Sequence, residues 1–97
     1  MDLEYVMNYL RVDADEDIPL IDNLMAASEA YLSGAVDDYA EKMKDSKFKS
    51  MADLVRLAMI SEWYDNRVYV KNDRYDKVST MIRSLIHQLQ YASVEVI

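Results

Sequence analysis

The amino-acid sequence predicts a small all-α domain, a helical bundle of three longer helices preceded by a short N-terminal helix. Apolar residues recur at intervals of three and four along nearly the whole chain, which is the main sequence signal for amphipathic helices. The 97 residues include one glycine and one proline, whereas β-sandwiches, Rossmann turns and phosphate-binding loops need more glycine. A chain of this length forms one domain with a thin core. We therefore expect one domain over residues 1–97, with a helical core to about residue 90 and an extended tail over residues 91–97.

The first two helices are expected near the N-terminus and after Pro19. The short first helix has one apolar stripe, formed by Leu3, Val6, Met7 and Leu10. Asp2 can cap this helix. The second helix is expected to begin with Asp17 as N-cap and Pro19 in its first turn, where the missing N–H has no helical partner to lose. Gly34 follows the apolar stripe of this helix and is expected to end it as a glycine C-cap.

The next segment, residues 35–50, is less regular. The helical spacing of Val36, Tyr39, Ala40 and Met43 allows a short helix there, and the basic part over residues 42–49 is expected to be a loop or a frayed helix end. A central helix should then begin with Ser50 as N-cap and Asp53 at the third helical position. Its apolar residues go almost all the way round, so we expect it to be buried on every side.

A fourth helix is expected from Asp73 to about Tyr91, on the most regular apolar stripe of the chain. The β-branched residues 93–97 are either an extended arm that adds to a partner or a disordered end.

Charge is distributed unevenly along the chain. Residues 1–41 contain eleven acidic residues and one base, a net charge of −10, whereas residues 42–97 contain seven acidic residues and ten bases, a net charge of +3. The overall charge of −7 argues against a protein that grips nucleic acid with its whole surface. The simple interpretation is solvated helix faces. The alternative is that the acidic part of one copy meets the basic part of the next, a head-to-tail contact that can close into a ring.

Several classes of protein are excluded or disfavoured by residues that the chain lacks. Without cysteine there is no disulfide, thiolate zinc site or cysteine nucleophile. His87 is the only histidine, and a surface or interface position is the expected one. No strictly apolar run is longer than four residues, as at residues 57–60, which is too short for a membrane span, and the N-terminus lacks the basic region of a secretory signal. We expect no cofactor, no metal and no membrane partner.

Two carboxylate pairs define the enzyme alternative. Glu62 and Asp65 are three residues apart on the predicted central helix, as are Asp38 and Glu41 further upstream. All-α nucleotide pyrophosphohydrolases hold magnesium with two such pairs on facing helices, and both pairs would have to share the metal. A generic helical protein-interaction module is the other alternative.

Tyrosine is abundant, with eight copies, and two of them lie on the first helix. Tyr5 and Tyr9 are one turn apart and off the apolar stripe, which gives this helix a second apolar face. That face is either covered in an assembly, since tyrosine suits interfaces, or it consists of two ordinary half-buried side chains.

Three segments resemble a known family. YLRVDADEDIPLIDNLMAASEAYL (residues 9–32) resembles the opening segment of the head–tail connector, or adaptor, proteins of tailed phages and prophages. LAMISEWYDNR (residues 57–67) resembles a second segment of that family. This segment is a helix whose last residues are two aromatic residues, an acidic residue, asparagine and arginine. IRSLIHQLQ (residues 82–90) resembles its closing segment, with Gln90 where arginine is common. The three segments occur in the family's order.

This resemblance implies a structural protein without enzymatic activity. Members of the family form a ring beneath the phage portal, extend the DNA channel toward the stopper or tail-completion protein, and complete the head after DNA packaging. The chain would then be made in the host cytoplasm and reside in the virion at the head–tail interface, and DNA would pass without sequence-specific binding. The interface or structural residues to which the resemblance and the tyrosine pattern point are Tyr5, Tyr9, Arg11, Asp13, Trp63, Tyr64, Asn66 and Arg67. Trp63 and Tyr64 are expected to anchor the core, and Arg67 to bind a carboxylate.

Overall fold

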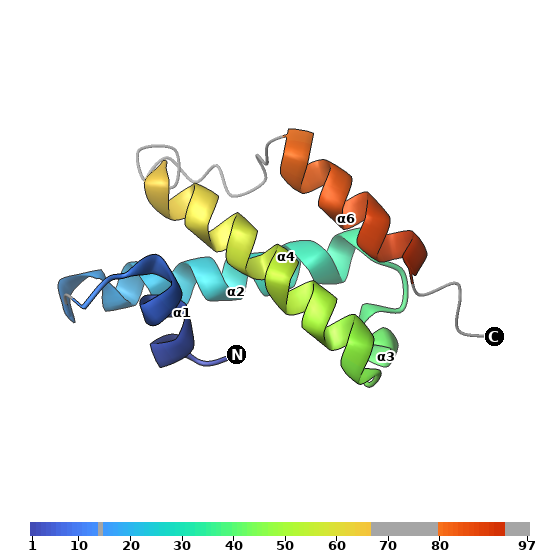
Figure 1. Ribbon diagram of the computed structural model, residues 1–97, viewed down its shortest axis with the longest axis horizontal. Coiled ribbons are helices and arrows are strands. Elements are labelled where there is room, and N and C mark those ends of the chain that lie inside the picture. Colours follow the sequence, from blue (N-terminus) through green and yellow to red (C-terminus); the bar gives the residue numbers. More distant parts are fainter. Residues whose placement is uncertain (14, 67–79, 93–97) are drawn as a thin grey trace.

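The computed structural model describes residues 1–13, 15–66 and 80–92, and within them it contains helices and turns but no strand (Figure 1). The predicted all-α class is confirmed for these residues. The helices are α1 (Leu3–Leu10), α2 (Ile18–Ala35), α3 (Tyr39–Lys42), α4 (Ser46–Asp65) and α6 (Thr80–Ala92), with a 3₁₀ turn at Asp15–Asp17. Residues 91 and 92 belong to α6 rather than to a tail. The rest of the predicted tail, residues 93–97, lies outside the described residues, as does Asp73, where the fourth helix was expected to start.

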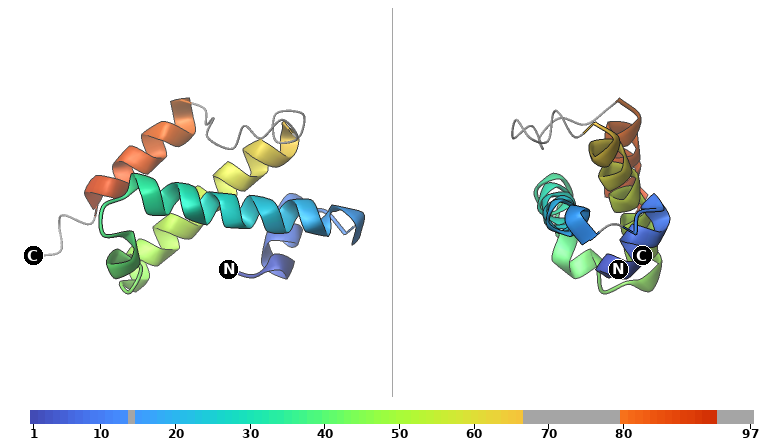
Figure 2. Two further views of the ribbon diagram at one scale, coloured as in Figure 1. Left: turned by 180° about the vertical axis from the view of Figure 1, so that it is seen from behind. Right: turned by 90° about the vertical axis from the view of Figure 1, so that its left-hand side faces the viewer.

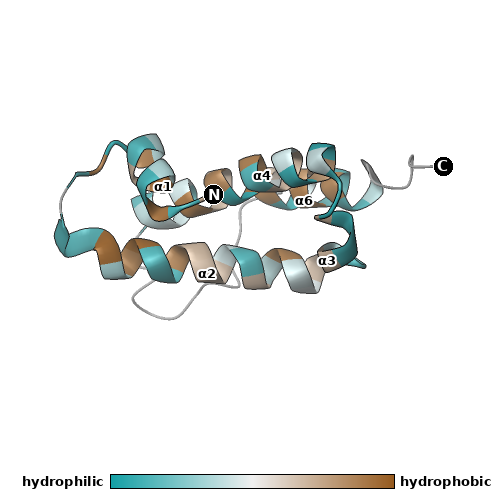
Figure 3. Ribbon diagram, turned by 90° about the horizontal axis from the view of Figure 1, so that it is seen from below, coloured by the Kyte–Doolittle hydropathy of each residue, from teal (hydrophilic) through white to brown (hydrophobic). Residues whose placement is uncertain are grey.

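The helices form two layers. Helices α1, α4 and α6 lie in one layer, with α4 in the middle, and α2 backs this layer (Figures 1 and 3). Seen from behind, α2 runs across α4 (Figure 2). The core lies between the layers and is formed by fully buried side chains that include Ile21, Leu24, Leu32, Ala52, Met59, Ile60 and Ile82. This arrangement leaves the outer side of the α1–α4–α6 layer without a covering element among the described residues.

The N-terminal half largely follows the sequence prediction. The Asp2 carboxylate caps α1 by accepting a hydrogen bond from the Tyr5 N–H at 2.9 Å. Pro19 lies in the first turn of α2, and Asp17 occupies the N-cap position but makes no side-chain cap bond there. The prediction that Gly34 ends α2 was wrong, because Gly34 lies inside the helix without a positive φ. The chain leaves the helix at Val36, which is buried in the core, so burial of Val36 fixes the end of α2 instead.

The start of the central helix differs from the prediction. Helix α4 begins four residues before Ser50, and its cap is Asp45, whose carboxylate accepts a hydrogen bond from the Phe48 N–H at 3.1 Å. Phe48 is buried and packs edge-on against Tyr39 of α3, with ring centroids 6.3 Å apart. The extra helical turn is what brings Phe48 into the core. Residues 42–49 are therefore the end of α3, a turn and the first turn of α4 rather than one loop.

The sequence predicted that the central helix is buried on every side, and this prediction was wrong for α4. Leu54 is 65% exposed and Met51 is 39% exposed, and both lie on the side away from the core. The neighbours α1, α2 and α6 cover the rest of the helix. A domain of this size has too few elements to enclose a 20-residue helix, so part of its apolar surface stays in contact with solvent.

Candidate assembly surfaces

Helix α1 has two apolar faces of different character. Val6 is fully buried in the core, whereas Tyr5 and Tyr9 are 54% and 51% exposed. Asp2 precedes Tyr5 by one turn and Glu4 lies in the first turn; both are exposed, and α1 contains no basic residue. We refer to the exposed rings of Tyr5 and Tyr9 with their flanking carboxylates as the tyrosine face. On this face, the fold leaves about half of each tyrosine side chain exposed to solvent.

Arg11 and Asp13 lie in the turn between α1 and α2. Arg11 adopts a left-handed backbone conformation (φ 59°, ψ 43°), and its N–H donates to the carbonyl of Asn8 at 3.2 Å, which closes α1. A non-glycine residue in this region costs roughly 1–2 kcal/mol. The side chains of Arg11 and Asp13 are both exposed. Arg11 thus shapes the turn through its backbone, and its guanidinium faces solvent.

Trp63, Tyr64 and Asn66 hold the C-terminal end of α4. Trp63 is 4% exposed and packs edge-on against Tyr31 of α2, with ring centroids 6.5 Å apart. The Tyr64 hydroxyl donates to the Asp17 carboxylate at 2.6 Å, which ties α4 to the start of α2. The Asn66 side-chain amide donates to the carbonyl of Glu62 at 2.8 Å and caps the helix. These three side chains serve the fold, and Arg67 lies outside the described residues.

A buried polar cluster joins α2 to α4, and the sequence did not predict it. Arg56 donates from Nε to the Ser28 hydroxyl at 3.0 Å and from Nη2 to the Met25 carbonyl at 2.8 Å, and it pairs with Glu29 at 3.1 Å. The Tyr39 hydroxyl donates to the same Glu29 carboxylate at 3.2 Å. Burial and the neighbouring Glu29 raise the pKa of Tyr39 to about 12. The available signal was Arg56 itself, a charged residue within an otherwise apolar stretch of α4.

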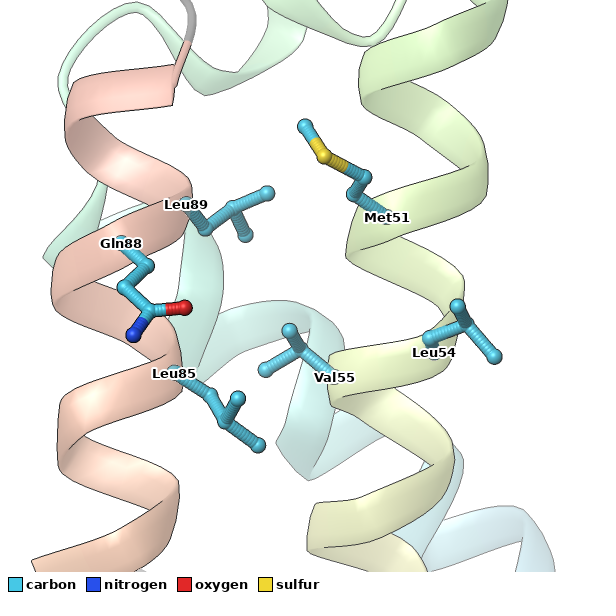
Figure 4. Close-up of a pocket in the computed structure, with 6 residues that line it drawn as sticks. All are labelled: Met51, Leu54, Val55, Leu85, Gln88 and Leu89. Atoms are coloured by element: carbon cyan, nitrogen blue, oxygen red, sulfur yellow. The ribbon is translucent and has the colours of Figure 1, made fainter.

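A groove runs between α4 and α6, with α2 behind it (Figure 4). It has a volume of about 270 Å³ and is lined by Met51, Leu54, Val55, Leu85, Gln88 and Leu89. Figure 4 shows Met51 facing Leu89, and Val55 facing Leu85 one turn further along. None of the six lining residues is charged. We refer to it as the α4–α6 groove. The excess of apolar residues on the central helix was its sequence signal, but the side that stays uncovered depends on where α6 packs.

Helix α6 is tied to the body at its C-terminal end. The Gln90 side chain accepts a hydrogen bond from the Asp37 N–H at 2.9 Å and donates to the Asp37 carboxylate at 3.0 Å. Asp37 lies in the turn between α2 and α3. Gln90 therefore makes a two-point contact with Asp37, which joins the C-terminal end of α6 to the turn between α2 and α3.

The two carboxylate pairs of the enzyme alternative lie near opposite ends of α4. Asp38 and Glu41 are on or next to α3, whose Tyr39 packs against Phe48 in the first turn of α4. Glu62 is 14 residues beyond Phe48, which is about 21 Å along a helix. One metal ion cannot bridge that distance. Within the described residues, no group of three or more histidine, aspartate or glutamate side chains is placed to hold a metal.

The described part of the chain is a two-layer all-α protein whose exposed apolar side chains include those of the tyrosine face and of the α4–α6 groove with its rim. Comparison of the chain with models of protein families, with curated proteins and with solved structures found no match. No described helix is both long and apolar enough to cross a membrane.

Proposed function

We propose that this chain is a structural head–tail connector of a tailed phage or prophage, which oligomerises into a ring beneath the portal and extends the DNA channel. The observation that carries the proposal is that one small domain has two unlike apolar surfaces, the tyrosine face and the α4–α6 groove. Contiguous exposed apolar patches of more than about a few hundred Å² are rare on monomeric proteins and mark interaction sites. Two unlike surfaces on one chain favour head-to-tail contacts, which form a ring when the rotation between neighbouring copies closes.

The charge distribution supports the same function. An acidic first part and a basic second part allow neighbouring copies to attract each other. The remaining net charge of −7 on each copy suits the wall of a channel, because like charge discourages DNA from binding to it. The resemblance of three sequence segments, in the same order as in phage connectors, also supports the proposal. The partners are then further copies of the chain, the portal protein and the stopper or tail-completion protein, in the virion and during assembly in the host cytoplasm.

Native mass spectrometry and negative-stain electron microscopy test this proposal. We expect the full chain, mixed with portal complexes of the phage or prophage that encodes it, to form a closed ring on the portal. Tyr5→Asp should abolish ring formation and leave the helical circular-dichroism signal intact, because Tyr5 is more than half exposed. A chain that stays monomeric at high concentration and also fails to bind the portal contradicts the proposal. Monomer in isolation does not, since a ring can close on the portal alone.

A further inference from the structure

We infer that the α4–α6 groove receives the tyrosine face of α1 from a second copy of this chain. The inference rests on the proposed function and goes beyond it, because it names the two surfaces that meet. Within one copy, the described residues leave both surfaces open: Tyr5 and Tyr9 are more than half exposed, and so is Leu54 on the rim of the groove.

The first argument is the match in spacing. The walls of the groove are two i, i+4 pairs, Met51 with Val55 on α4 and Leu85 with Leu89 on α6 (Figure 4). Tyr5 and Tyr9 are also an i, i+4 pair, so their rings project from one side of α1 about one turn apart. The two tyrosine side chains therefore have the same spacing along α1 as the apolar side chains along each wall of the groove. This is the geometry by which an amphipathic helix binds in a groove between two others.

The second argument is the size and chemistry of the groove. Its volume of about 270 Å³ is below the roughly 300–1,000 Å³ of small-molecule pockets, and it is open along the protein surface. It is lined by five apolar side chains and one amide, that of Gln88. A tyrosine ring buries apolar surface and needs a hydrogen-bond partner for its hydroxyl. Gln88, exposed on α6, supplies such a partner at the edge of the groove.

The third argument is charge. Glu4 is the one charged residue within α1, and Asp2, the N-cap of the helix, precedes Tyr5 by one turn. Helix α6 contains no acidic residue, and Lys47 lies one turn before Met51 on α4. Lys47 is exposed and makes no ion pair within the described residues, whereas Lys44 pairs with Glu41 and Lys49 with Asp53. The carboxylates of the tyrosine face thus find an uncommitted ammonium group beside the groove.

The placement of the two surfaces makes the contact head-to-tail. Helix α1 lies on one side of α4 and α6 on the other (Figure 1). When the tyrosine face of one copy fills the groove of a second copy, the first copy keeps an open groove and the second keeps an open tyrosine face. Such contacts propagate from copy to copy, and they close into a ring where the rotation between neighbours allows it.

Cysteine cross-linking tests the contact directly, because the full chain has no native cysteine. Asn8→Cys places a thiol beside the tyrosine face, and Gln88→Cys places one at the groove, both at exposed positions. The two single variants are mixed in equal amounts at high concentration and treated with a short bismaleimide. We expect the mixed Asn8→Cys/Gln88→Cys dimer, identified by its mass, to predominate over both homodimers. The double variant on one chain should give a ladder of larger species.

The matched control is Ser33→Cys, an exposed position on α2 in the other layer. A mixture of Ser33→Cys with Gln88→Cys should give no more mixed dimer than random collision does. The inference is overturned if Gln88→Cys homodimers predominate, since copies then meet groove to groove. It is also overturned if the mixture with Ser33→Cys cross-links as well as the mixture with Asn8→Cys.

A charge reversal gives a second readout. Lys47→Glu should weaken self-association roughly three- to tenfold in dissociation constant at low salt, the size expected when one surface attraction becomes a repulsion. Lys44→Glu should leave self-association unchanged, because that residue lies in the α3–α4 turn. Equal effects of the two substitutions overturn the inference. If rings form on the portal but the Asn8→Cys and Gln88→Cys variants do not cross-link, this inference is refuted and the connector function is not. The expected cross-link without any portal binding supports it and refutes the connector function.

Discussion

Arg56 places a guanidinium between α2 and α4, where the Ser28 hydroxyl, the Met25 carbonyl and the Glu29 carboxylate surround it. We expect Arg56→Ala to lower the free energy of unfolding by about 2–3 kcal/mol, since hydrogen bonds to charged groups and the packing of the aliphatic stem are lost together. The side chain of Glu29 is half exposed, so water compensates part of the loss. Urea denaturation measures this change. Arg83→Ala, at an exposed arginine of α6, is the matched control and should stay within about 0.5 kcal/mol of the wild type.

Tyr39 gives the same cluster a dependence on pH. In the unfolded chain a tyrosine ionises near pH 10, whereas burial and Glu29 raise the pKa of Tyr39 in the fold to about 12. Between these values the unfolded state releases a proton that the folded state keeps, so stability falls as pH rises, by about 1 kcal/mol per pH unit. The difference in unfolding free energy between wild type and Tyr39→Phe should therefore shift in favour of the variant from pH 10 to pH 12. A constant difference would show that Tyr39 ionises as freely in the fold as in the unfolded chain.

At the scale of the element, substitutions at two candidate N-caps of α4, Asp45 and Ser50, test where the helix begins. Asp45→Ala should lower the free energy of unfolding by about 1 kcal/mol, because its carboxylate accepts the Phe48 N–H at the helix N-terminus. Ser50→Ala removes the cap that the sequence predicted, and Ser50 lies exposed inside the helix. That substitution should be neutral or slightly stabilising, since alanine is the better helix former. Chemical denaturation measures the free energy of unfolding of both variants. A larger decrease for Ser50→Ala than for Asp45→Ala would contradict the structure.

The glycine of α2 allows a second prediction for an element. Gly34 lies near the end of the helix with helical backbone, and a Cβ added there would meet nothing within 4 Å. Gly34→Ala should raise the unfolding free energy by up to about 1 kcal/mol, the usual difference between the two residues inside helices. A thermal melt with a higher midpoint checks this. A lower midpoint would mean that the helix does end at Gly34 with a left-handed glycine.

The elements show which features of the fold the sequence could predict. The stripe of α1 and the cap Asp2 follow from residues within one turn of each other, so local pattern was sufficient. The start of α4 was predicted five residues late, because Ser50 and Asp53 mimic a cap, while burial of Phe48 against Tyr39 favours the earlier cap, Asp45. The same reason applies at Gly34, where the burial of Val36 decided the end of α2. Tertiary packing outweighs local propensity at such boundaries.

At the scale of the whole molecule, the candidate surfaces were predictable in part. The second face of α1 could be predicted from Tyr5 and Tyr9, because their periodicity places them away from the core. The α4–α6 groove could not, since it depends on how α6 packs against α4 across a large sequence separation. The cluster around Arg56 joins residues 28 positions apart and was equally out of reach of local patterns.

The exposed apolar side chains of this small domain make a last prediction, that its thermal stability depends on its own concentration. Tyr5, Tyr9, Leu54 and Met81 are all at least half exposed, so self-association would bury surface that folding leaves in water. A partner at 100 times its dissociation constant adds about 2.7 kcal/mol to the folded state, and 1 kcal/mol shifts the melting temperature of a domain this small by roughly 4–8 °C. Differential scanning calorimetry over a range of protein concentrations should therefore show a midpoint that rises with concentration. Tyr9→Asp should flatten this dependence at an unchanged low-concentration midpoint, because the substitution lies on the surface. A midpoint of the wild type that is independent of concentration would mean that the exposed side chains do not bind a second copy without a further partner such as the portal.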